Sequence, residues 1–254
     1  MAEGRPLVSV IMPAYNAAQH IAKSIASVQS QTVADWELIV LDDGSSDATV
    51  QVAAALAEAD TRIRLYENVQ NMGAAGSRNR GLELCRGEYV AFLDSDDMWH
   101  PEKLEKQLEC FRKTGADLVY TAYAIVSGEG QQLCRDYLVP ASIDFSGLLK
   151  ENVIGCSTVM LSAKVAAQYR FTEKYYHEDY VLWLELLRAG GKAVGVEQVL
   201  VDYWSHSDSK AGNKKKAAWE RWRIYRDYLK FPMVKSAWYF ACYALASLRK
   251  YKRV

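Results

Sequence analysis

The sequence lacks several features that would fix its class at once. Its five cysteines include no CxxC pair, which argues against a zinc knuckle, a thioredoxin-type redox pair and a disulfide framework. Neither GxGxxG nor GxxxxGK[ST] occurs, so the dinucleotide-binding and P-loop motifs are absent. With 15 glycines, 5 prolines and 50% hydrophobic residues, the 254-residue chain is neither low-complexity nor disordered.

The sequence also lacks a segment that would carry the chain through a membrane. The opening residues, MAEGRPLVSV, show no basic stretch followed by an apolar run, so we expect no secretion signal and a cytoplasmic location. An uncharged, mainly apolar run covers residues 236–248, and its thirteen residues reach only about 20 Å of the ~30 Å hydrocarbon core. A membrane span is therefore not expected there.

The net charge of zero hides an uneven distribution. Residues 210–254 contain thirteen Lys or Arg and two acids, a balance of +11, and residues 1–209 carry the compensating −11. This split predicts an acidic body and a basic tail that meets an anionic partner, either nucleic acid or anionic lipid headgroups.

Short apolar runs alternate with helix-like stretches along the first 205 residues. This alternation predicts an α/β fold with a mostly parallel sheet covered by helices on both faces, and the absence of repeats or linkers predicts a single domain over residues 1–209. Expected strands cover residues 7–12, 36–41, 62–67, 89–94, 117–123 and 199–203, and expected helices cover 21–28, 48–58, 74–84 and 101–113.

Three of the expected strands run directly into polar residues. PAYN (13–16), DDGS (42–45) and DSDD (94–97) each follow a strand, and ligands of parallel sheets bind beyond the carboxyl ends of the strands. An isolated DxD is more often an Asp-rich turn, but here five aspartates share one edge and would repel one another without a cation. Carboxylates suit Mg²⁺ or Mn²⁺, which bridge them to a diphosphate.

The order of these motifs resembles that of family 2 glycosyltransferases, which have the GT-A fold. PAYN, DDGS, Arg78 within GAAGSRNRGL, DSDD, and HED at 177–179 before LWLELL follow one another between residue 7 and about residue 205. Each motif is weak alone, but the ordered set is specific. The resemblance implies a Rossmann-like GT-A domain that binds a nucleotide-sugar in its first half, about residues 1–97, and an acceptor in residues 98–209, and that inverts the anomeric centre.

The resemblance also implies roles for the residues around the nucleotide. Pro13, Tyr15 and Asn16 would border it, and Asp43, with Asp42 beside it, would hydrogen-bond the base, typically N3–H of uracil. A UDP-sugar is therefore the favoured donor.

Further roles concern the diphosphate and the metal. Arg78 would contact the nucleotide end of the donor, and Asp94, with Ser95 next to it, would face the ribose or the sugar. Asp96, together with Asp94 and Asp97, would hold Mn²⁺ or Mg²⁺, which stabilises the departing diphosphate as a Lewis acid. His206 would complete the metal site or touch the diphosphate; a surface histidine is the equal alternative.

The acceptor hydroxyl needs a general base, and the resemblance gives this role to Asp179. The residue falls in the expected first turn of a helix, where the helix dipole favours the ionised form that a base requires. An ordinary helix cap is the alternative for Asp179, and Glu178 is the second candidate for the base. The segment 154–158 before this helix lines the acceptor side or forms a core strand.

The tail, residues 210–254, interleaves Trp and Tyr with Lys and Arg at helical spacing, which predicts basic amphipathic helices. We expect the tail to bind an anionic membrane surface, with each basic residue adding on the order of 1 kcal/mol, or to pack against the catalytic domain or another copy of the chain. The expected location is peripheral, on the inner face of the cytoplasmic membrane.

The sequence thus predicts a metal-dependent inverting glycosyltransferase that adds a sugar to a lipid-linked or growing surface saccharide, as in O-antigen, capsule and teichuronic-acid-type synthesis. A nucleotidyltransferase is one alternative, but PAYNAAQH offers neither the glycine-rich loop nor the catalytic lysine that it would need. A non-enzymatic nucleic-acid-binding protein would explain the basic tail but not the acidic edge, so we expect no nucleic-acid partner.

Overall fold

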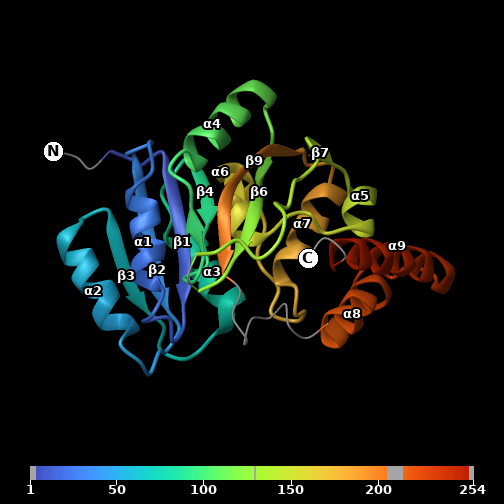
Figure 1. Cartoon of the computed structure of the whole chain (residues 1–254), viewed down its shortest axis with the longest axis horizontal. Helices are drawn as coiled ribbons and strands as arrows, with labels where there is room; N and C mark the ends of the chain where they lie inside the picture. The colour runs from blue at the N-terminus through green and yellow to red at the C-terminus, as the bar shows by residue number, and fades with distance from the viewer. Residues whose placement is uncertain (1–3, 129, 205–213, 252–254) are drawn as a thin grey trace.

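The computed structural model describes residues 4–128, 130–204 and 214–251, which form one nine-stranded sheet with helices on both faces (Figure 1). The strands are β1 (Val8–Ala14), β2 (Trp36–Asp42), β3 (Ile63–Glu67), β4 (Tyr89–Phe92), β5 (Met98–Trp99), β6 (Leu118–Val126), β7 (Ser142–Ile143), β8 (Met160–Ser162) and β9 (Ala193–Trp204). The α-helices are α1 (Ile21–Gln29), α2 (Thr49–Ala59), α3 (Gly73–Leu84), α4 (Lys103–Thr114), α5 (Phe145–Lys150), α6 (Ala163–Gln168), α7 (Glu178–Arg188), α8 (Lys214–Arg223) and α9 (Met233–Tyr251). A 3₁₀ turn, η1, covers Cys156–Thr158, and a π-helical turn, η3, covers Ile224–Tyr228.

The sheet is mostly parallel, as the sequence predicted. Its order is β3-β2-β1-β4-β8-β6-β9-β5, and β7 pairs with β9. β1 pairs in parallel with β2 on one side and β4 on the other, whereas β8 is antiparallel to both of its neighbours, β4 and β6. The carboxyl ends of β1, β2 and β4 therefore meet at one edge.

Side-chain alternation along the central strands supplies two separate cores. In β1, Val10 and Met12 face one core and Ile11 faces the other, and all three are fully buried. The first core packs against α1, α2 and α4, and the second against α3, α5, α6 and α7. Continuous apolar strands covered on both faces are the pattern that predicted this architecture.

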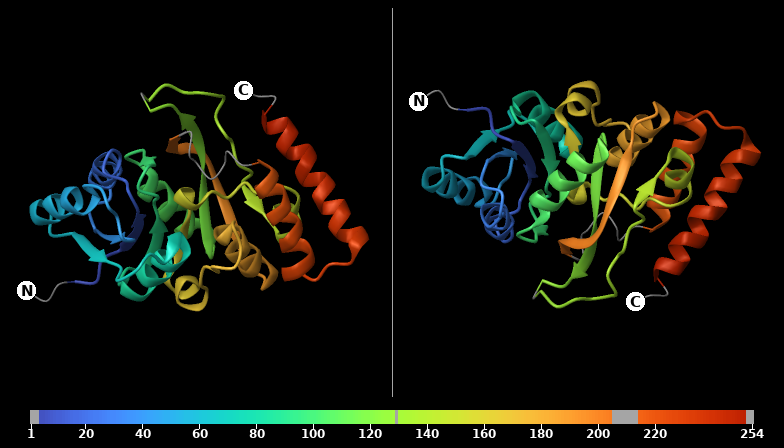
Figure 2. Two further views of the ribbon diagram at one scale, coloured as in Figure 1. Left: turned by 90° about the horizontal axis from the view of Figure 1, so that it is seen from below. Right: turned by 90° about the horizontal axis from the view of Figure 1, so that it is seen from above.

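The C-terminal helices share the second of these cores. Ile224 and Tyr225 of η3 and Leu229 after it are buried in the same cluster as the apolar residues of α7. The composition change at residue 209 therefore marks a change in charge and not a break in packing. In both views of Figure 2, α9 is the outermost element on its side of the molecule.

Helix α3 lies unusually close to the sheet because glycine occupies one of its inward positions. A Cβ at Gly81 would collide with Cγ2 of Ile11 in β1. The close approach brings the polar residues of α3, Ser77 and Arg78 among them, against the strand ends, where both are buried.

Candidate active site

The three predicted motifs meet at one edge of the sheet. Ala14 at the end of β1 pairs with Asp42 at the end of β2, and Ile11 pairs with Phe92, the last residue of β4. Asp43 and Asp96 thus follow strands that flank the same central strand. The convergence expected from parallel strands is present.

The Asp42–Asp43 pair holds the backbone of the site. The buried Asp43 carboxylate accepts hydrogen bonds from Met72 N and Gly73 N, each at 2.8 Å, and from Asn68 Nδ2 at 2.7 Å, so it caps the start of α3. Asp42 Oδ2 accepts from the amides of Gly44 and Ser45, at 3.1 and 3.0 Å. Asp42 Oδ1 is buried without a hydrogen-bond partner among the described residues, which gives this pair one unsatisfied acceptor.

The end of β1 is shaped by Asn16 rather than by its neighbours. Asn16 adopts a left-handed backbone, φ 49°, and its Oδ1 accepts from Ser46 N at 2.9 Å, which ties the PAYN turn to the loop after β2. Tyr15 beside it is 55% exposed, and Pro13 lies within the strand. Tyr15 is therefore the residue of this motif whose ring is open to a ligand.

Arg78 joins the donor side of the site to the helix that carries the predicted base. Its Nη2 lies 2.5 Å from Asp94 Oδ1, and its Nη1 lies 2.9 Å from Glu178 Oε1. The side chain is 4% exposed; burial opposes its charge, but Asp94 and Glu178 raise the pKa of Arg78 well above its ordinary value. Arg78 is therefore a buried, ion-paired residue and not a solvated arginine on the surface.

The DSDD turn at the end of β4 points its carboxylates in two directions. Asp94 is partly exposed and pairs with Arg78, whereas Asp97 is buried and accepts from Ser157 Oγ at 2.5 Å. Burial first, and then the charges of Asp96 and Asp94, raises the pKa of Asp97 well above its usual range. The Ser95 carbonyl accepts from Ser24 Oγ at 2.8 Å, which fixes the turn to α1.

Asp179 and Glu178 begin α7 side by side but differ in their engagement. Glu178 is buried and committed to Arg78, whereas the Asp179 carboxylate is partly exposed and accepts from the amide of Tyr180 at 2.7 Å. Desolvation, and then the Glu178 charge, raises the pKa of Asp179 to about 6. Of the two candidates for the base, Asp179 has the available carboxylate and a pKa close to neutrality.

A cavity of about 160 Å³ opens beside these residues. It lies between the start of α3 and the segment before α7, and Met72, Gly73, Tyr176 and Glu178 are among its lining residues. Glu178 connects the cavity to the ion-pair chain through Arg78. The start of α3 therefore borders both the donor side and a space next to the predicted base.

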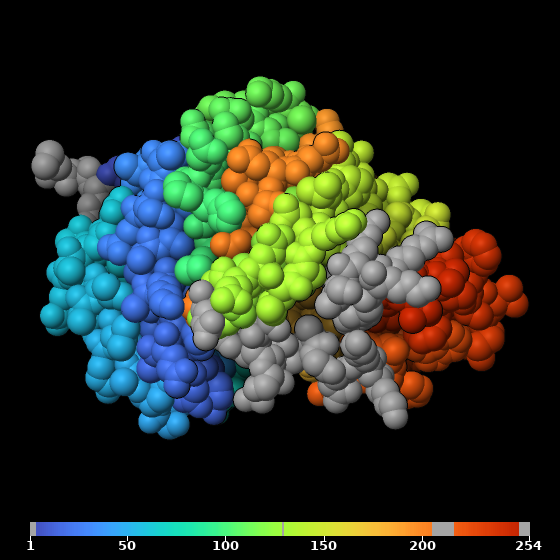
Figure 3. All heavy atoms as spheres, in the orientation of Figure 1, coloured from blue at the N-terminus to red at the C-terminus, as the bar shows by residue number. Residues whose placement is uncertain are grey.

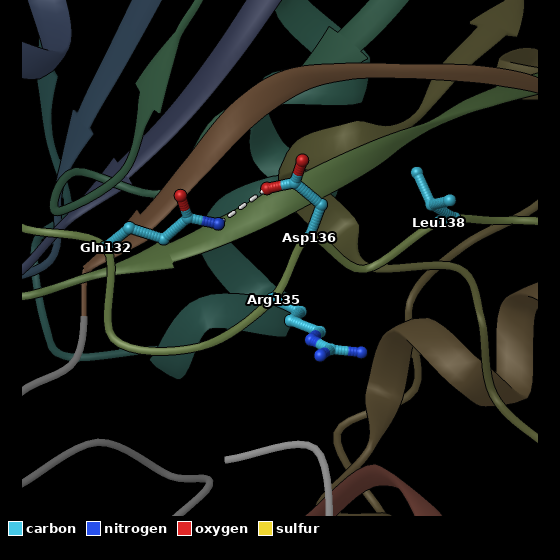
Figure 4. A pocket seen from close by; sticks show the side chains of 4 residues that line it. All are labelled: Gln132, Arg135, Asp136 and Leu138. Carbon is cyan, nitrogen blue, oxygen red and sulfur yellow. Dashed lines mark hydrogen bonds between the residues drawn. The ribbon is translucent and has the colours of Figure 1, made fainter.

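A larger hollow lies elsewhere, on the loop that follows β6. Its volume is about 480 Å³, and its lining residues are Gln132, Arg135, Asp136 and Leu138 (Figure 4). Gln132 donates to Asp136 across it at 2.7 Å. In Figure 3 this loop runs across the front of the molecule towards the blue N-terminal elements. None of the predicted site residues lines the hollow.

A family model for Glycosyl transferase family 2 matches residues 9–169, which contain every predicted motif except HED. The putative teichuronic acid biosynthesis glycosyltransferase TuaG of Bacillus subtilis is 37% identical over 250 residues, which cover 98% of this chain and 99% of that protein. This chain belongs to glycosyltransferase family 2.

A further relative agrees with the family, and two solved structures agree with the fold. WfgD of Escherichia coli, a UDP-Glc:alpha-D-GlcNAc-diphosphoundecaprenol beta-1,3-glucosyltransferase, is 36% identical over 96% of this chain and 95% of its own length. S. aureus TarS 1–349 in complex with UDP-GlcNAc has a TM-score of 0.73 at 16% identity, over 94% of this chain and 71% of that one. PcManGT from Pyrobaculum calidifontis, in complex with GDP-Man and Mn²⁺, has a TM-score of 0.71 at 15% identity, over 96% and 74%. The GT-A fold of the enzyme is thereby shown.

The acidic turn of this family 2 enzyme suits a divalent cation. Burial, and then repulsion from Asp96 and Asp94, raises the pKa of Asp97, and a cation beside these carboxylates would relieve the repulsion. Within the described part of the chain, no group of three His, Cys, Asp or Glu is placed to hold a metal by itself. Mg²⁺ and Mn²⁺ need only one or two carboxylates when a diphosphate supplies further oxygens. His206, the further predicted ligand, lies outside the described residues.

Sequence reasoning missed the residues that support this turn from below. The segment 154–158 contains the η1 turn, which covers only its last three residues. Ser157 Oγ accepts from the Asp94 amide at 3.1 Å, and the Ser157 carbonyl accepts from Trp99 Nε1 at 2.9 Å. Lys103 is completely buried, with its Nζ 3.8 Å from the centre of the Trp99 ring and 2.7 Å from Gln107 Oε1. Desolvation lowers the pKa of Lys103 well below its usual range. The contacts of Ser157 join residues 63 and 58 positions apart, so no local sequence pattern signals them.

Proposed function

We propose that this glycosyltransferase is a metal-dependent inverting enzyme of surface-polysaccharide synthesis. It would move a sugar from a nucleoside diphosphate sugar, with UDP favoured, to a hydroxyl of a lipid-linked or growing saccharide. The observation that carries the proposal is the buried bridge from Asp94 through Arg78 to Glu178, because it places the donor-side carboxylates next to the start of α7. Asp179 follows Glu178 directly, so the donor and the base would lie within one connected site.

On the donor side, Asp96 and Asp94 would hold the divalent ion, which when bound would neutralise charge on the leaving diphosphate. Arg78 pairs with Asp94 and orients it at the wall of the site. Asp43, with Asp42 beside it, would hydrogen-bond a ring N–H of the base, and the amides of Met72 and Gly73 hold the Asp43 carboxylate in place. Tyr15 would pack on the nucleotide from the open side.

On the acceptor side, Asp179 would take the proton of the attacking hydroxyl as the glycosidic bond forms and the bond to the diphosphate breaks. A carboxylate with a pKa of about 6 is largely ionised at neutral pH and is a stronger base than an ordinary aspartate. Glu178 would act by fixing Arg78 and by raising the basicity of Asp179 through its charge. It is therefore a positioning residue.

The names of two relatives support the proposed acceptor class. WfgD bears the name of an enzyme that uses a diphosphoundecaprenol-linked sugar, and TuaG is named for teichuronic acid biosynthesis. We extend a lipid-linked saccharide acceptor to this chain, together with a location on the inner face of the cytoplasmic membrane and contact between residues 210–254 and anionic lipid. Among the described residues, no helix is long and apolar enough to cross a bilayer.

The test is transfer or hydrolysis of UDP-sugars in the presence of Mn²⁺. Asp96→Asn should lower turnover by two or more orders of magnitude, since the carboxylate that would bind the metal is lost. Asp136→Asn, at an exposed aspartate on the β6 loop, is the matched control and should leave turnover unchanged. Full activity of Asp96→Asn, or equal activity with and without chelator, would contradict the metal role.

A further inference from the structure

The C-terminal helix α9 is apolar on two opposite faces. Its inner face packs on the body: Ser236 is completely buried, and Tyr239 and Phe240 lie against the second core. Tyr225 of η3 and Phe231 contact the Tyr239 ring, with centroids at 6.2 and 5.9 Å. The helix is therefore seated on the enzyme by its aromatic side.

The outer face of α9 carries a second apolar stripe that nothing in the described chain covers. Val234, Trp238, Leu245 and Leu248 are 83%, 63%, 58% and 62% exposed, and the exposed Ala241 completes the row. Steps of four and three residues place these side chains along one side of a helix. A helix that is apolar on both sides is typical of one whose second side is covered in use.

The charge around this stripe identifies what covers it. Between residues 233 and 251 the sequence has no Asp or Glu, and its basic residues stand near the two ends, Lys235 at one and Arg249 and Lys250 at the other. Pairing two copies of α9 along the stripe would set basic ends near each other in either direction, with no acid on the helix to compensate. An anionic bilayer offers both an apolar layer for the stripe and negative charge for the ends.

We propose that the outer face of α9, defined by Val234, Trp238, Ala241, Leu245 and Leu248, lies flat in the interface of an anionic lipid bilayer. The proposal deepens the membrane contact given under the proposed function and rests on it for the lipid-linked acceptor. The stripe includes the exposed Trp238, and tryptophan is a side chain that membrane interfaces favour. The helix would lie along the surface and not cross it.

This placement also brings α7, the helix that begins with Glu178 and Asp179, near the membrane. Arg221 of α8 lies between the two helices, with its guanidinium 3.5 Å from the Tyr180 ring of α7 and 4.8 Å from the Tyr243 ring of α9. Tyr180 follows Asp179 directly. The docked helix and the predicted base are therefore parts of one packed layer, and a bilayer on α9 lies beside the helix that would receive a lipid-linked acceptor.

The experiment compares two matched double variants of the full chain. Leu245→Ser/Leu248→Ser removes two exposed leucines of the stripe, and Leu133→Ser/Leu138→Ser removes two exposed leucines of the β6 loop. Co-sedimentation is measured with vesicles of phosphatidylglycerol and phosphatidylcholine, and with phosphatidylcholine alone. Wild type and the loop variant should bind the anionic vesicles, less so in high salt. The stripe variant should bind at least about tenfold more weakly, since burial of a single leucine is worth that factor.

Three outcomes would overturn the proposal: no binding by wild type, equal binding by both double variants, or a solution dimer by light scattering that the stripe variant alone dissociates. UDP-sugar hydrolysis without lipid is measured in parallel and should be the same in all three proteins. If the wild type does not hydrolyse UDP-sugars, the result counts against the proposed reaction. If the wild type hydrolyses them but does not bind vesicles, the result counts only against the docking face.

Discussion

Two buried arginines on either side of α7 show how differently the enzyme builds its two regions. At the acidic edge, Arg78 is held by two carboxylates, Asp94 and Glu178. In the C-terminal layer, Arg221 is equally buried but is held by the rings of Tyr180 and Tyr243, and its Nε and Nη1 have no hydrogen-bond partner among the described residues. The first region balances a buried cation with carboxylates, whereas the second surrounds a buried cation with aromatic rings.

The largest effect is expected for Asp179, the carboxylate in the first turn of α7. Asp179→Asn should lower the turnover number by about 10²- to 10⁴-fold, the usual contribution of a positioned general base. The rate of glycosyl transfer under donor saturation is the measurement, with Asp136→Asn as the control. Glu178→Gln keeps an oxygen for Arg78 and should cost much less; the reverse order of the two variants would move the base to Glu178.

The second effect tests the ion-paired arginine. Arg78→Met removes one cation from two carboxylates and should lower the free energy of unfolding by about 3–5 kcal/mol, because Asp94 and the buried Glu178 are left uncompensated. Urea denaturation at neutral pH measures the change. A variant as stable as wild type would show that the bridge does not hold the two halves of the site together.

A third effect concerns pH. The folded-state pKa of Asp179 is raised from 3.8 to about 6, so its ionisation destabilises the fold; this penalty is absent below about pH 4 and complete above about pH 6. Asp179→Asn should therefore be more stable than wild type at pH 7 by on the order of 1–3 kcal/mol, with the gain vanishing near pH 4. The activity of wild type should fall as the pH drops below about 6, where Asp179 becomes protonated. If Asp179→Asn is inactive but no more stable than wild type at pH 7, the residue acts in catalysis and its ionisation does not destabilise the fold.

The smallest effect is expected for the second arginine. Arg221→Met leaves no carboxylate unpaired and keeps much of the stem's packing, so the free energy of unfolding should change by no more than about 1 kcal/mol, within the range of a cation–π contact. Urea denaturation beside Arg78→Met makes the comparison direct. A loss as large as that of Arg78→Met would mean that ring contacts fix a buried cation as firmly as carboxylates do.

The strands and the edge of the site were predictable because each central strand is a nearly continuous apolar run that ends in polar residues. Expected strands at 7–12 and 36–41 correspond to β1 and β2 within two residues. The three-residue β8 was missed because so short a strand shows no periodicity, and β9 begins at Ala193, before the expected residue 199, in a stretch that contains Gly195.

Within the site, residue types were predictable but their partners were not. Arg78 finds Asp94 sixteen residues away and Glu178 a hundred residues away, a pairing that only the fold creates. The inward turn of Asp97 depends on Ser157 from a different segment, and alternation along DSDD cannot reveal it. Local pattern therefore placed these residue types at the strand ends, whereas tertiary contacts decide which of the carboxylates are paired or buried.

The buried amine of Lys103 can be used to detect opening of the core that surrounds it. An amine with a lowered pKa reacts readily with acylating reagents once they reach it, yet this one is completely shielded between Trp99 and Gln107. Its labelling must wait until the core beneath the acidic turn opens. Mass spectrometry can follow the acylation rate of Lys103 with and without a nucleotide-sugar. A slower rate with the ligand would show that binding reduces the opening of the core under the DSDD turn.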